Sequence, residues 1–450
     1  MSHVIAAVST ALAPSAIGIL RLSGDGAIEV AQKVFSRPLQ SVPDRTLVLG
    51  TLYDRQGRAI DQVLCTVSRA PHSYTGEDTA ELQCHGSPAV LAAGLEALFA
   101  AGARQAQRGE FTKRAFLNGQ LDLTQAEAVA DLIDAQTAQE AANAAGQLQG
   151  AVSKKVDGVY DRLTTLLAHY HVVLDYPEED LEPFTLAEIE ENLASAREEL
   201  TGLLGSFDRG RILRSGVKAA LLGRPNTGKS SLLNALAGYD RVIVTPVAGT
   251  TRDTVEETVL VGGVKLRLMD TAGIRTTGDL VEALGVQRAE AAAKQADLAI
   301  FVCDGSEPLT PEDRRAMEAA GTAKRRLAAV NKSDLPQVIS PADLTGFDAV
   351  LSVSAKTGAG LEELSAQIAA WFGAGDACDG SLLTNARQAE AVERALGHLA
   401  SAQEAQAGQM TPDGILYDVE AAMEALAELT GRAMREDVTN RIFERFCVGK

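Results

Sequence analysis

Cysteine is scarce in this 450-residue sequence, and the cysteines that occur are widely scattered. The five are Cys65, Cys84, Cys303, Cys378 and Cys447, and none forms a Cys-x-x-Cys spacing. An odd number without such spacing indicates neither a disulfide framework nor a zinc site. The pattern is typical of a protein of the reducing cytoplasm.

Long hydrophobic runs and aromatic residues are also lacking. No stretch reaches about 18 uninterrupted apolar residues, and the N-terminus lacks the basic start and continuous apolar core of a signal peptide. We therefore expect no membrane span. Aromatic residues make up only 4% of the chain, with the single tryptophan Trp371, so the sequence gives no sign of an aromatic binding stripe.

Basic residues are outnumbered by acidic ones. The chain has 42 Lys and Arg against 60 Asp and Glu, for a net charge of −18. Phosphate contacts need a local excess of Lys and Arg, so this balance argues against general nucleic-acid binding. An RNA partner would have to use a local basic patch or reach the chain through another subunit.

Hydrophobic residues, by contrast, are plentiful and make up 46% of the chain. The length suggests about two to four domains. Residues 1–119 alternate short β-like runs with turns and one helical stretch, Pro88–Ala101, which predicts a small α+β domain. Residues 120–212 and 377–450 have apolar residues three or four positions apart, as in a helical bundle. Residues 213–376 alternate apolar runs with helical lengths, which predicts a doubly wound α/β domain inserted into the bundle. The strands expected in the first domain are Val4–Val8, Ile17–Leu22, Leu47–Leu49 and Val63–Val67.

The inserted domain carries a glycine-rich phosphate-binding motif. Gly223–Ser230 reads GRPNTGKS, which fits GxxxxGK[ST], follows an apolar run and opens a predicted helix. The backbone N–H groups of such a loop surround phosphates at a helix N-terminus. We expect Lys229 to reach the β- and γ-phosphates of a nucleotide and Ser230 to ligate Mg²⁺.

Three later motifs each follow a further apolar run. DTAG, Asp270–Gly273, places a carboxylate near Mg²⁺ and a glycine N–H near the γ-phosphate. NKSD, Asn331–Asp334, supplies a carboxylate on Asp334 that accepts hydrogen bonds from the N1–H and 2-amino groups of guanine, which adenine does not offer. SAK, Ser354–Lys356, completes the guanine pocket. Because the carboxyl ends of parallel strands meet at one edge of a sheet, the motifs predict one GTP site in a Ras-like P-loop G domain.

The segment between the P-loop and DTAG is TPVAGTTRD, Thr245–Asp253, which suits a mobile switch. Thr251 is the expected Mg²⁺ ligand there, with Thr250 as the alternative. DTAG is followed by Ile274, where Ras-like proteins carry a glutamine that orients the attacking water. Glu282 is the nearest carboxylate that could replace this glutamine, although a solvated charge on the second switch helix also explains it. The residues predicted to contact GTP are Asn226, Thr227, Gly228, Lys229, Ser230, Ser231, Thr245, Pro246, Val247, Ala248, Gly249, Thr250, Thr251, Asp270, Thr271, Ala272, Gly273, Asn331, Lys332, Asp334, Ser354, Ala355 and Lys356.

Further motifs lie outside the G domain: SYTGED at Ser73–Asp78, ELQCHG at Glu81–Gly86, RGEFTKRAFLNGQLDLTQAEAVADLI at Arg108–Ile133, and a terminal FCVGK. Through these and the G motifs, the chain resembles over its full length the MnmE (TrmE) family of tRNA modification GTPases. Ribosome-assembly GTPases of the Era or EngA kind share the G motifs but end in an RNA-binding module, and no GXXG clamp or basic tract follows Gly375. A regulatory GTPase with a helical effector arm would leave the other motifs unexplained.

The resemblance implies an N-terminal domain that binds a 5-formyl- or methylene-tetrahydrofolate and supports a homodimer. Its folate positions correspond to Arg21, Glu81, Gln120 and Lys450. Arginine and lysine suit the glutamyl tail of a folate, and a carboxylate suits the amino groups of a pterin. Taken singly, Arg21 and Glu81 are also explained as surface charges. Gln120 stands where the family commonly has lysine, so it can hydrogen-bond but adds no charge.

The resemblance also implies a potassium-dependent GTPase that is activated when two G domains face each other. Its K⁺ site corresponds to Asn226, Thr245, Val247 and Thr250, and Glu282 matches the catalytic glutamate of the family. The implied reaction modifies C5 of the wobble uridine of certain tRNAs, giving aminomethyl or carboxymethylaminomethyl types. It uses a folate one-carbon unit and an FAD-containing partner, MnmG (GidA), which could supply much of the RNA-binding surface. Cys447, in the terminal motif, is expected to take part in this reaction, with a packing role as the alternative.

Overall fold

The computed structural model divides the chain into two compact units. One unit joins Met1–Asp134, Ala144–Thr201 and Glu390–Lys450, and the other joins Ala135–Asn143 and Gly202–Ala389. The structure describes residues 3–175, 186–239, 257–269, 291–373, 379–408, 412–432, 442–443 and 446–449. None of the helices within these ranges has the length and apolarity needed to cross a membrane.

The N-terminal domain is built on a six-stranded sheet with the strand order β3-β4-β5-β2-β1-β6. Neighbouring strands are antiparallel except for the parallel pair β1 and β6. The strands are β1 Ile5–Val8, β2 Ser15–Ser23, β3 Val48–Tyr53, β4 Ala59–Ser68, β5 Thr79–Gly86 and β6 Arg104–Gln105. In the central pair, Arg21 of β2 lies directly opposite Glu81 of β5.

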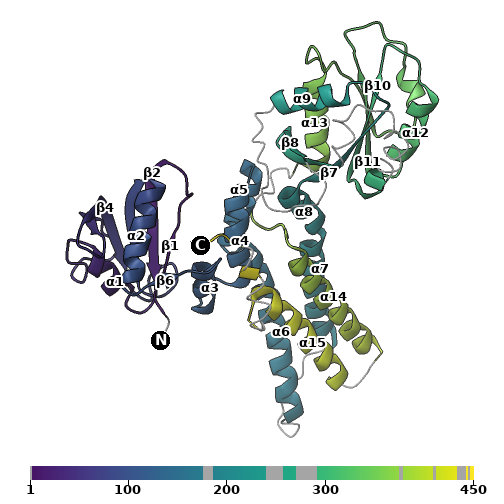
Figure 1. Cartoon of the computed structure of the whole chain (residues 1–450). Helices are drawn as coiled ribbons and strands as arrows, with labels where there is room; N and C mark the ends of the chain where they lie inside the picture. Colours follow the sequence, from purple (N-terminus) through teal and green to yellow (C-terminus); the bar gives the residue numbers. More distant parts are fainter. Residues whose placement is uncertain are drawn as a thin grey trace. The chain divides into compact units, whose positions relative to one another are not determined.

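The two faces of this sheet have different surroundings because side chains alternate along each strand. Helices α1 (Ala27–Val34) and α2 (Pro88–Ala100) pack on one face, where buried residues such as Leu20, Leu82 and Leu91 form the domain core (Figure 1). The predicted α+β domain is therefore confirmed. Within residues 1–119, α1, β5, β6 and the helix Glu110–Leu117 were not predicted, while the four predicted strands and the predicted helix are all present.

The opposite face of the sheet is only partly covered. Ile5 and Ala7 of β1 pack there against Phe111 of helix α3, which spans Glu110–Leu117. On the neighbouring strands, Ile17, Leu49 and Leu64 are exposed. Leu49 and Leu64 are direct partners on β3 and β4, so they form one apolar patch.

Helices from both flanks of the inserted domain share the first unit, as the sequence predicts for an interrupted helical domain. They are α4 Leu123–Asp134, α5 Ala138–Leu148 (which runs on from the second unit), α6 Ala151–Asp175, α7 Leu186–Gly205, α14 Ala386–Ala407 and α15 Pro412–Thr430. Ion pairs join neighbouring helices: Arg162 of α6 to Glu199 of α7, and Arg394 of α14 to Glu428 of α15. The C-terminal Phe443 and Phe446 pack against Ala126 and Val129 of α4.

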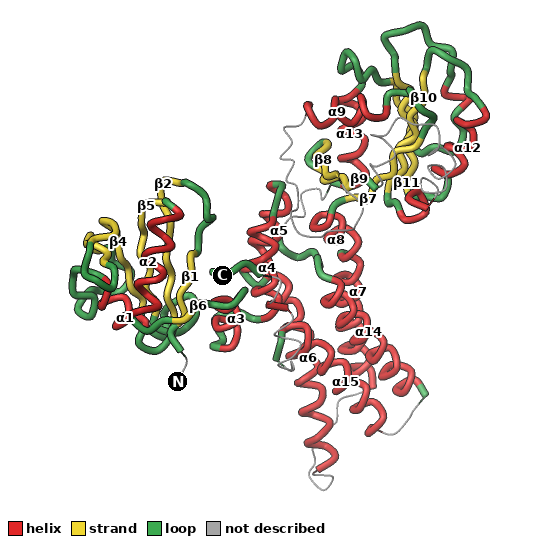
Figure 2. Tube along the Cα trace, viewed as in Figure 1, coloured by secondary structure: helices red, strands yellow, loops and turns green. Residues whose placement is uncertain are grey.

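The second unit contains the doubly wound sheet, in the order β12-β11-β10-β7-β9-β8. All neighbours are parallel except the edge pair β8 and β9. Helices α9 and α13 pack on one face and α12 on the other, so helices enclose the strands in Figure 2. This arrangement confirms the predicted fold class. The elements are α8 Phe207–Ser215, β7 Val217–Leu222, α9 Lys229–Tyr239, β8 Glu257–Val261, β9 Val264–Leu268, β10 Leu298–Asp304, α12 Pro311–Ala320, β11 Arg325–Asn331, η1 Pro341–Asp343, β12 Ala349–Ser352 and α13 Leu361–Phe372.

Candidate functional sites

The P-loop links the end of β7 to the start of α9 and needs glycine at two crowded positions. Gly223 has φ of +139°, and a Cβ there would lie 2.2 Å from the carbonyl oxygen of Val302. Gly228 has φ of +94°, and its Cβ would lie 2.2 Å from Nδ2 of Asn331. Asn226 also adopts a left-handed backbone, with φ of +65°. A non-glycine residue rarely holds this conformation outside tight turns and functional loops.

Lys229 begins α9 and turns its ammonium back into the P-loop. Its Nζ donates to the carbonyl oxygens of Gly223 and Arg224, both at 2.7 Å. Burial lowers the pKa of Lys229 to about 8, and the negative charge of Asp313 opposes this effect only in part. A phosphate in the loop would give the ammonium an anionic partner. Ser230 and Ser231 follow in the first turn of α9, where backbone N–H groups favour anions.

The NKSD and SAK loops and the P-loop meet at the side chain of Asn331, at the end of β11. Its Nδ2 donates to the carbonyl oxygen of Thr227 at 2.8 Å, and its Oδ1 accepts from the backbone N–H of Ala355 at 3.0 Å. Asn331 and Thr227 are both buried. One amide group therefore holds together the loops GRPNTGKS, NKSD and SAK.

Asp334 is positioned by the SAK loop. The hydroxyl of Ser354 donates to Oδ1 of Asp334 at 2.7 Å, and this hydrogen bond holds the pKa of Asp334 below its usual range. Ser354 is buried whereas Asp334 is exposed. The ionised carboxylate is thus oriented and open to solvent. Lys332, which has φ of +63°, pairs through Nζ with the buried carboxylate of Asp304.

Part of the predicted nucleotide site lies outside the described residues. This part comprises the switch residues Thr245, Pro246, Val247, Ala248, Gly249, Thr250 and Thr251, the DTAG residues Asp270, Thr271, Ala272 and Gly273, and Glu282. Of the predicted metal ligands, the structure describes Ser230 and Asn226. A hydroxyl and an amide oxygen are suitable donors for Mg²⁺ and K⁺, so the residues present fit these ions.

In the first unit, Arg21 and Glu81 meet on the partly covered face of the N-terminal sheet. Arg21 Nε donates to Oε1 of Glu81 at 2.7 Å. The guanidinium carbon lies 5.6 Å from the ring centre of Tyr74 and 5.8 Å from that of Phe111. These contacts with two rings fix the arginine plane. Phe111 is fully buried, whereas Tyr74 is 40% exposed.

The loop that carries Tyr74 also contacts α3 and approaches Gln120. The Tyr74 hydroxyl lies 2.9 Å from Oγ1 of Thr112, which links the SYTGED loop to α3. Gln120 is exposed, and its Nε2 would lie 3.2 Å from a Cβ on Gly76 in that loop. Lys450 lies outside the described residues. Its neighbour Gly449 accepts a hydrogen bond from Ser9 Oγ at 2.9 Å.

The C-terminal segment is held between the end of β1 and the start of α3. The backbone N–H of Gly109 donates to the carbonyl oxygen of Cys447 at 3.2 Å, and Arg108 forms a β-bridge with Val448. Gly109 has φ of +63°, and a Cβ there would lie 2.7 Å from the carbonyl oxygen of Phe443. Cys447 itself is exposed. The thiol is therefore accessible on a segment whose backbone is fixed.

Sequence reasoning missed the aromatic and hydroxyl neighbours of Arg21. Tyr74, Phe111 and Thr112 lie within the motifs SYTGED and RGEFTKRAF, but no pattern within either motif shows that Tyr74 and Phe111 meet Arg21 or that Thr112 bonds to Tyr74. The alternation in TAELQCHG could have revealed β5, because Ala80, Leu82 and Cys84 are buried in turn.

Comparison with known proteins covers the whole chain. Residues 123–447 match the model described as the MnmE helical domain, and residues 4–120 match the GTP-binding protein TrmE N-terminus. The tRNA modification GTPase MnmE of Symbiobacterium thermophilum is 44% identical over 99% of both chains. The chain belongs to the MnmE family of tRNA modification GTPases. Similar relatives, with the same description, come from Roseiflexus sp. (43% identity) and Thermoanaerobacter pseudethanolicus (42%), each over 99% of both chains.

Among solved structures, a bacterial selenocysteine-specific elongation factor is 21% identical and covers 33% of this chain and 27% of its own, with a TM-score of 0.26. Aquifex aeolicus Era bound to GDP and AlF4⁻ is 23% identical and covers 40% of this chain and 65% of its own, with a TM-score of 0.25.

Proposed function

We propose that this chain hydrolyses GTP in a potassium-dependent cycle that supports modification of C5 of the wobble uridine of certain tRNAs, to aminomethyl or carboxymethylaminomethyl types. A tetrahydrofolate derivative supplies the one-carbon unit, and an FAD-containing partner of the MnmG (GidA) kind shares the reaction. The observation that carries the proposal is the Arg21–Glu81 ion pair in the same domain that holds the Cys447 segment. A nucleotide site alone would suit any GTPase, whereas this second site calls for a further ligand.

For GTP, the structure supports a division of roles among the loops. Lys229 and the N–H groups at the start of α9 would hold the phosphates, and Asp334, oriented by Ser354, would select guanine. Ser230 and Thr251 would hold Mg²⁺, and Asn226, Thr245, Val247 and Thr250 would hold K⁺. Bound there, these ions supply positive charge to the phosphates. Glu282 would orient the attacking water.

For the folate, the chemistry of the Arg21 site suits a flat heteroaromatic acid. Tyr74 offers a ring face, Glu81 a carboxylate for amino groups, and Arg21 a fixed cation. Gln120 and Lys450 would add contacts at the ends of the SYTGED loop and the C-terminal segment. Cys447 would act at the site of one-carbon transfer, because its thiol is exposed beside the start of α3.

An exposed apolar patch and the net negative charge of the chain bear on its protein partners and on tRNA binding. The apolar patch of Leu49 and Leu64, with Ile17 on the same face, suits a homodimer formed through the N-terminal sheets. The net charge of −18 favours an arrangement in which the FAD-containing partner provides much of the tRNA-binding surface. The free thiols of Cys65, Cys84 and Cys303 are compatible with the reducing cytoplasm.

A reconstituted reaction tests the proposal. The purified chain, an FAD-containing partner, a tRNA transcript, an amine donor (ammonium for the aminomethyl product, glycine for the carboxymethylaminomethyl product) and methylene-tetrahydrofolate labelled in its one-carbon unit are incubated with GTP in potassium buffer. Label should enter the wobble uridine, and omission of GTP or replacement of K⁺ by Na⁺ should stop it. Label that stays in the folate under every condition would contradict the proposal. Label that enters tRNA without GTP would contradict its GTP-dependent part.

A further inference from the structure

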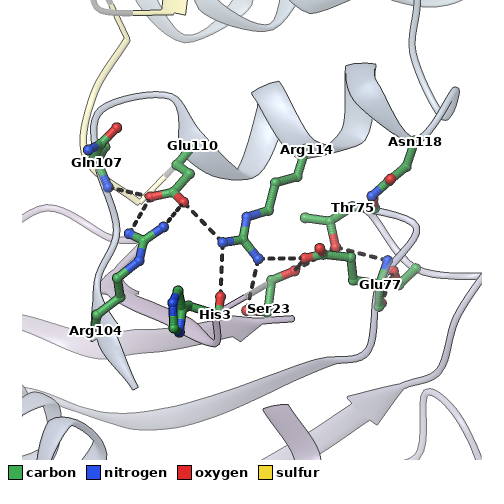
Figure 3. Close-up of polar contacts among 10 residues, drawn as sticks. His3, Ser23, Thr75, Glu77, Arg104, Gln107, Glu110, Arg114 and Asn118 are labelled. Carbon is green, nitrogen blue, oxygen red and sulfur yellow. Dashed lines mark hydrogen bonds and ion pairs between the residues drawn. The ribbon is translucent and has the colours of Figure 1, made fainter. Parts of the chain in front are cut away.

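A second arginine of the N-terminal domain, Arg114 of α3, contacts three other chain segments and a glutamate at the start of its own helix. Its Nη1 donates to Oε2 of Glu77 at 2.8 Å and to the carbonyl oxygen of Ser23 at 3.5 Å. Its Nη2 donates to the carbonyl oxygen of His3 at 2.9 Å and to Oε1 of Glu110 at 3.0 Å (Figure 3). The side chain is 11% exposed. These contacts use the planar fork of a guanidinium, which a lysine ammonium does not reproduce.

From Glu77, the contacts of Arg114 extend into the SYTGED loop. Glu77 Oε2 also accepts from Ser23 Oγ at 2.8 Å, and Ser23 Oγ lies 2.7 Å from Oγ1 of Thr75. The carbonyl oxygen of Thr75 accepts from Nδ2 of Asn118 at 2.7 Å. The backbone on either side of Gly76 is thus fixed, and Tyr74 immediately precedes it.

From Glu110, the contacts extend to the C-terminal segment. The Glu110 carboxylate accepts a bidentate pair from Arg104 and a hydrogen bond from the backbone N–H of Gln107 at 2.8 Å. These bonds fix the turn that precedes α3. That turn contains Gly109, whose N–H holds the carbonyl oxygen of Cys447.

The cluster is electrically balanced, since two arginines, Arg104 and Arg114, face two glutamates, Glu77 and Glu110 (Figure 3). Both glutamates and Arg114 are largely shielded from water. Loss of one partner leaves a shielded charge without its match, so the neighbouring loop must move to hydrate it. Neither Arg21 nor Glu81 is a member of this cluster.

We infer that Arg114 is a positioning residue for one-carbon transfer. Through Glu77 it places the loop that presents Tyr74 to the folate, and through Glu110 it places the segment that carries Cys447. The inference rests on the proposed function for the roles of the folate and of the thiol. Beyond that function, the inference assigns to Arg114 the placement of the Tyr74 loop relative to the Cys447 segment.

The test uses the full-length chain with Arg114→Lys, and Arg69→Lys as the matched control. Arg69 also pairs with a carboxylate, Asp44, and donates to backbone carbonyls, but it lies in a different loop. Three quantities are measured: the Kd of 5-formyltetrahydrofolate by calorimetry, the rate of iodoacetamide alkylation of Cys447 by peptide mass spectrometry, and Tm. Arg114→Lys should weaken folate binding about tenfold and change the alkylation rate about threefold or more. Arg69→Lys should change neither.

Two further variants separate positioning from folding. Glu77→Gln should raise the KM for the folate and leave Cys447 alkylation unchanged. Glu110→Gln should change the alkylation rate and lower kcat for tRNA modification, with little change in folate Kd. Glu77→Gln and Glu110→Gln could instead each change both folate binding and the rate of Cys447 alkylation, in parallel with Tm. The cluster would then only stabilise the domain, and the inference would be overturned. It is also overturned if Arg114→Lys leaves either quantity unchanged.

Arg21→Ala distinguishes failure of this inference from failure of the proposed folate site. Unchanged folate affinity in Arg21→Ala would overturn the folate site itself. The alkylation rates of Arg114→Lys and Glu110→Gln would then still decide whether Arg114 positions Cys447. Weakened binding in Arg21→Ala, together with normal binding in Arg114→Lys, would overturn only the role of Arg114.

Discussion

Asn331 donates from Nδ2 to the carbonyl oxygen of Thr227 at 2.8 Å, and thereby joins the NKSD loop to the P-loop. Both groups are buried, and the other side of the same amide accepts from Ala355 N–H. We therefore expect nucleotide affinity to depend on Asn331, which contacts both the P-loop and the SAK loop. It also explains why position 228 must be glycine, because any Cβ would collide with this amide.

Asn331→Ala should therefore weaken GTP and GDP to a similar extent. It leaves the buried carbonyl oxygen of Thr227 and the partly buried N–H of Ala355 without this partner, at about 1–3 kcal/mol for a buried group, so affinity should fall about a hundredfold. Fluorescent-nucleotide titration measures both affinities. Asp334→Asn is the matched control, because it changes the base-reading group and should weaken guanine nucleotides relative to xanthine nucleotides. Normal GDP affinity in Asn331→Ala would contradict the bridging role.

Nucleotide binding should take up a proton above about pH 8. Burial holds the pKa of Lys229 at about 8 in the nucleotide-free chain. A bound triphosphate favours the charged ammonium and raises that pKa. Between the free and bound pKa values, affinity should fall about tenfold per pH unit as pH rises. Calorimetry in buffers of different ionisation enthalpy measures the uptake, and Lys229→Arg, which stays charged, should remove it.

Hydrolysis should require K⁺ and Glu282. GTP turnover in Na⁺ at matched ionic strength should be much slower than in K⁺, because the role proposed for Asn226, Thr245, Val247 and Thr250 is to hold K⁺. Glu282→Ala should abolish most turnover while changing GTP affinity only a few-fold, since orientation of water acts on the transition state. Equal rates of GTP turnover in the two salts would contradict the proposed potassium site. A near-normal kcat in Glu282→Ala would show that Glu282 has no catalytic role and is a solvated surface charge.

The Glu110 cluster should make the N-terminal domain sensitive to acid. Burial acts to raise the pKa of Glu110, but hydrogen bonds from Arg104, Gln107 and Arg114 outweigh it and lower the pKa from 4.5 to about 2. A lowered pKa stabilises the folded state above the unfolded value, and this stabilisation is lost as pH falls from about 4.5 to about 2. The loss amounts to at most about 3 kcal/mol. Urea unfolding between pH 2 and 6 should show this slope, and Glu110→Gln should flatten it.

Much of the fold follows from local pattern. The apolar runs that end in GRPNTGKS, NKSD and SAK became β7, β11 and β12 in the order that a doubly wound sheet requires. Helix α1 was missed although Ala27, Val30, Ala31 and Val34 recur at helical spacing and are buried. Strand β5 was missed because its polar residues Glu81 and Gln83 lie on the partly covered face and interrupt the apolar run.

The second site was less accessible to sequence reasoning, because its contacts join distant segments. Arg21 and Glu81 are 60 residues apart, and Arg114 reaches a carbonyl oxygen 111 residues away at His3. The strand register and the docking of α3 bring these groups together, and no local motif specifies either. Family resemblance indicated Arg21 and Glu81, but only the three-dimensional arrangement shows Tyr74 beside Arg21 and Arg114 between the two elements.

The most direct test of the central claim is nucleoside analysis of tRNA from a strain that lacks this chain. Wobble-uridine modification should disappear, and it should return with the wild-type gene but not with Lys229→Ala or Cys447→Ser. The purified Cys447→Ser protein should keep potassium-stimulated GTP hydrolysis, because its G motifs lie in the other unit. An unchanged modification profile in the deletion strain would contradict the account. If Cys447→Ser fully restored wobble-uridine modification, the thiol would have no chemical role and would serve packing alone.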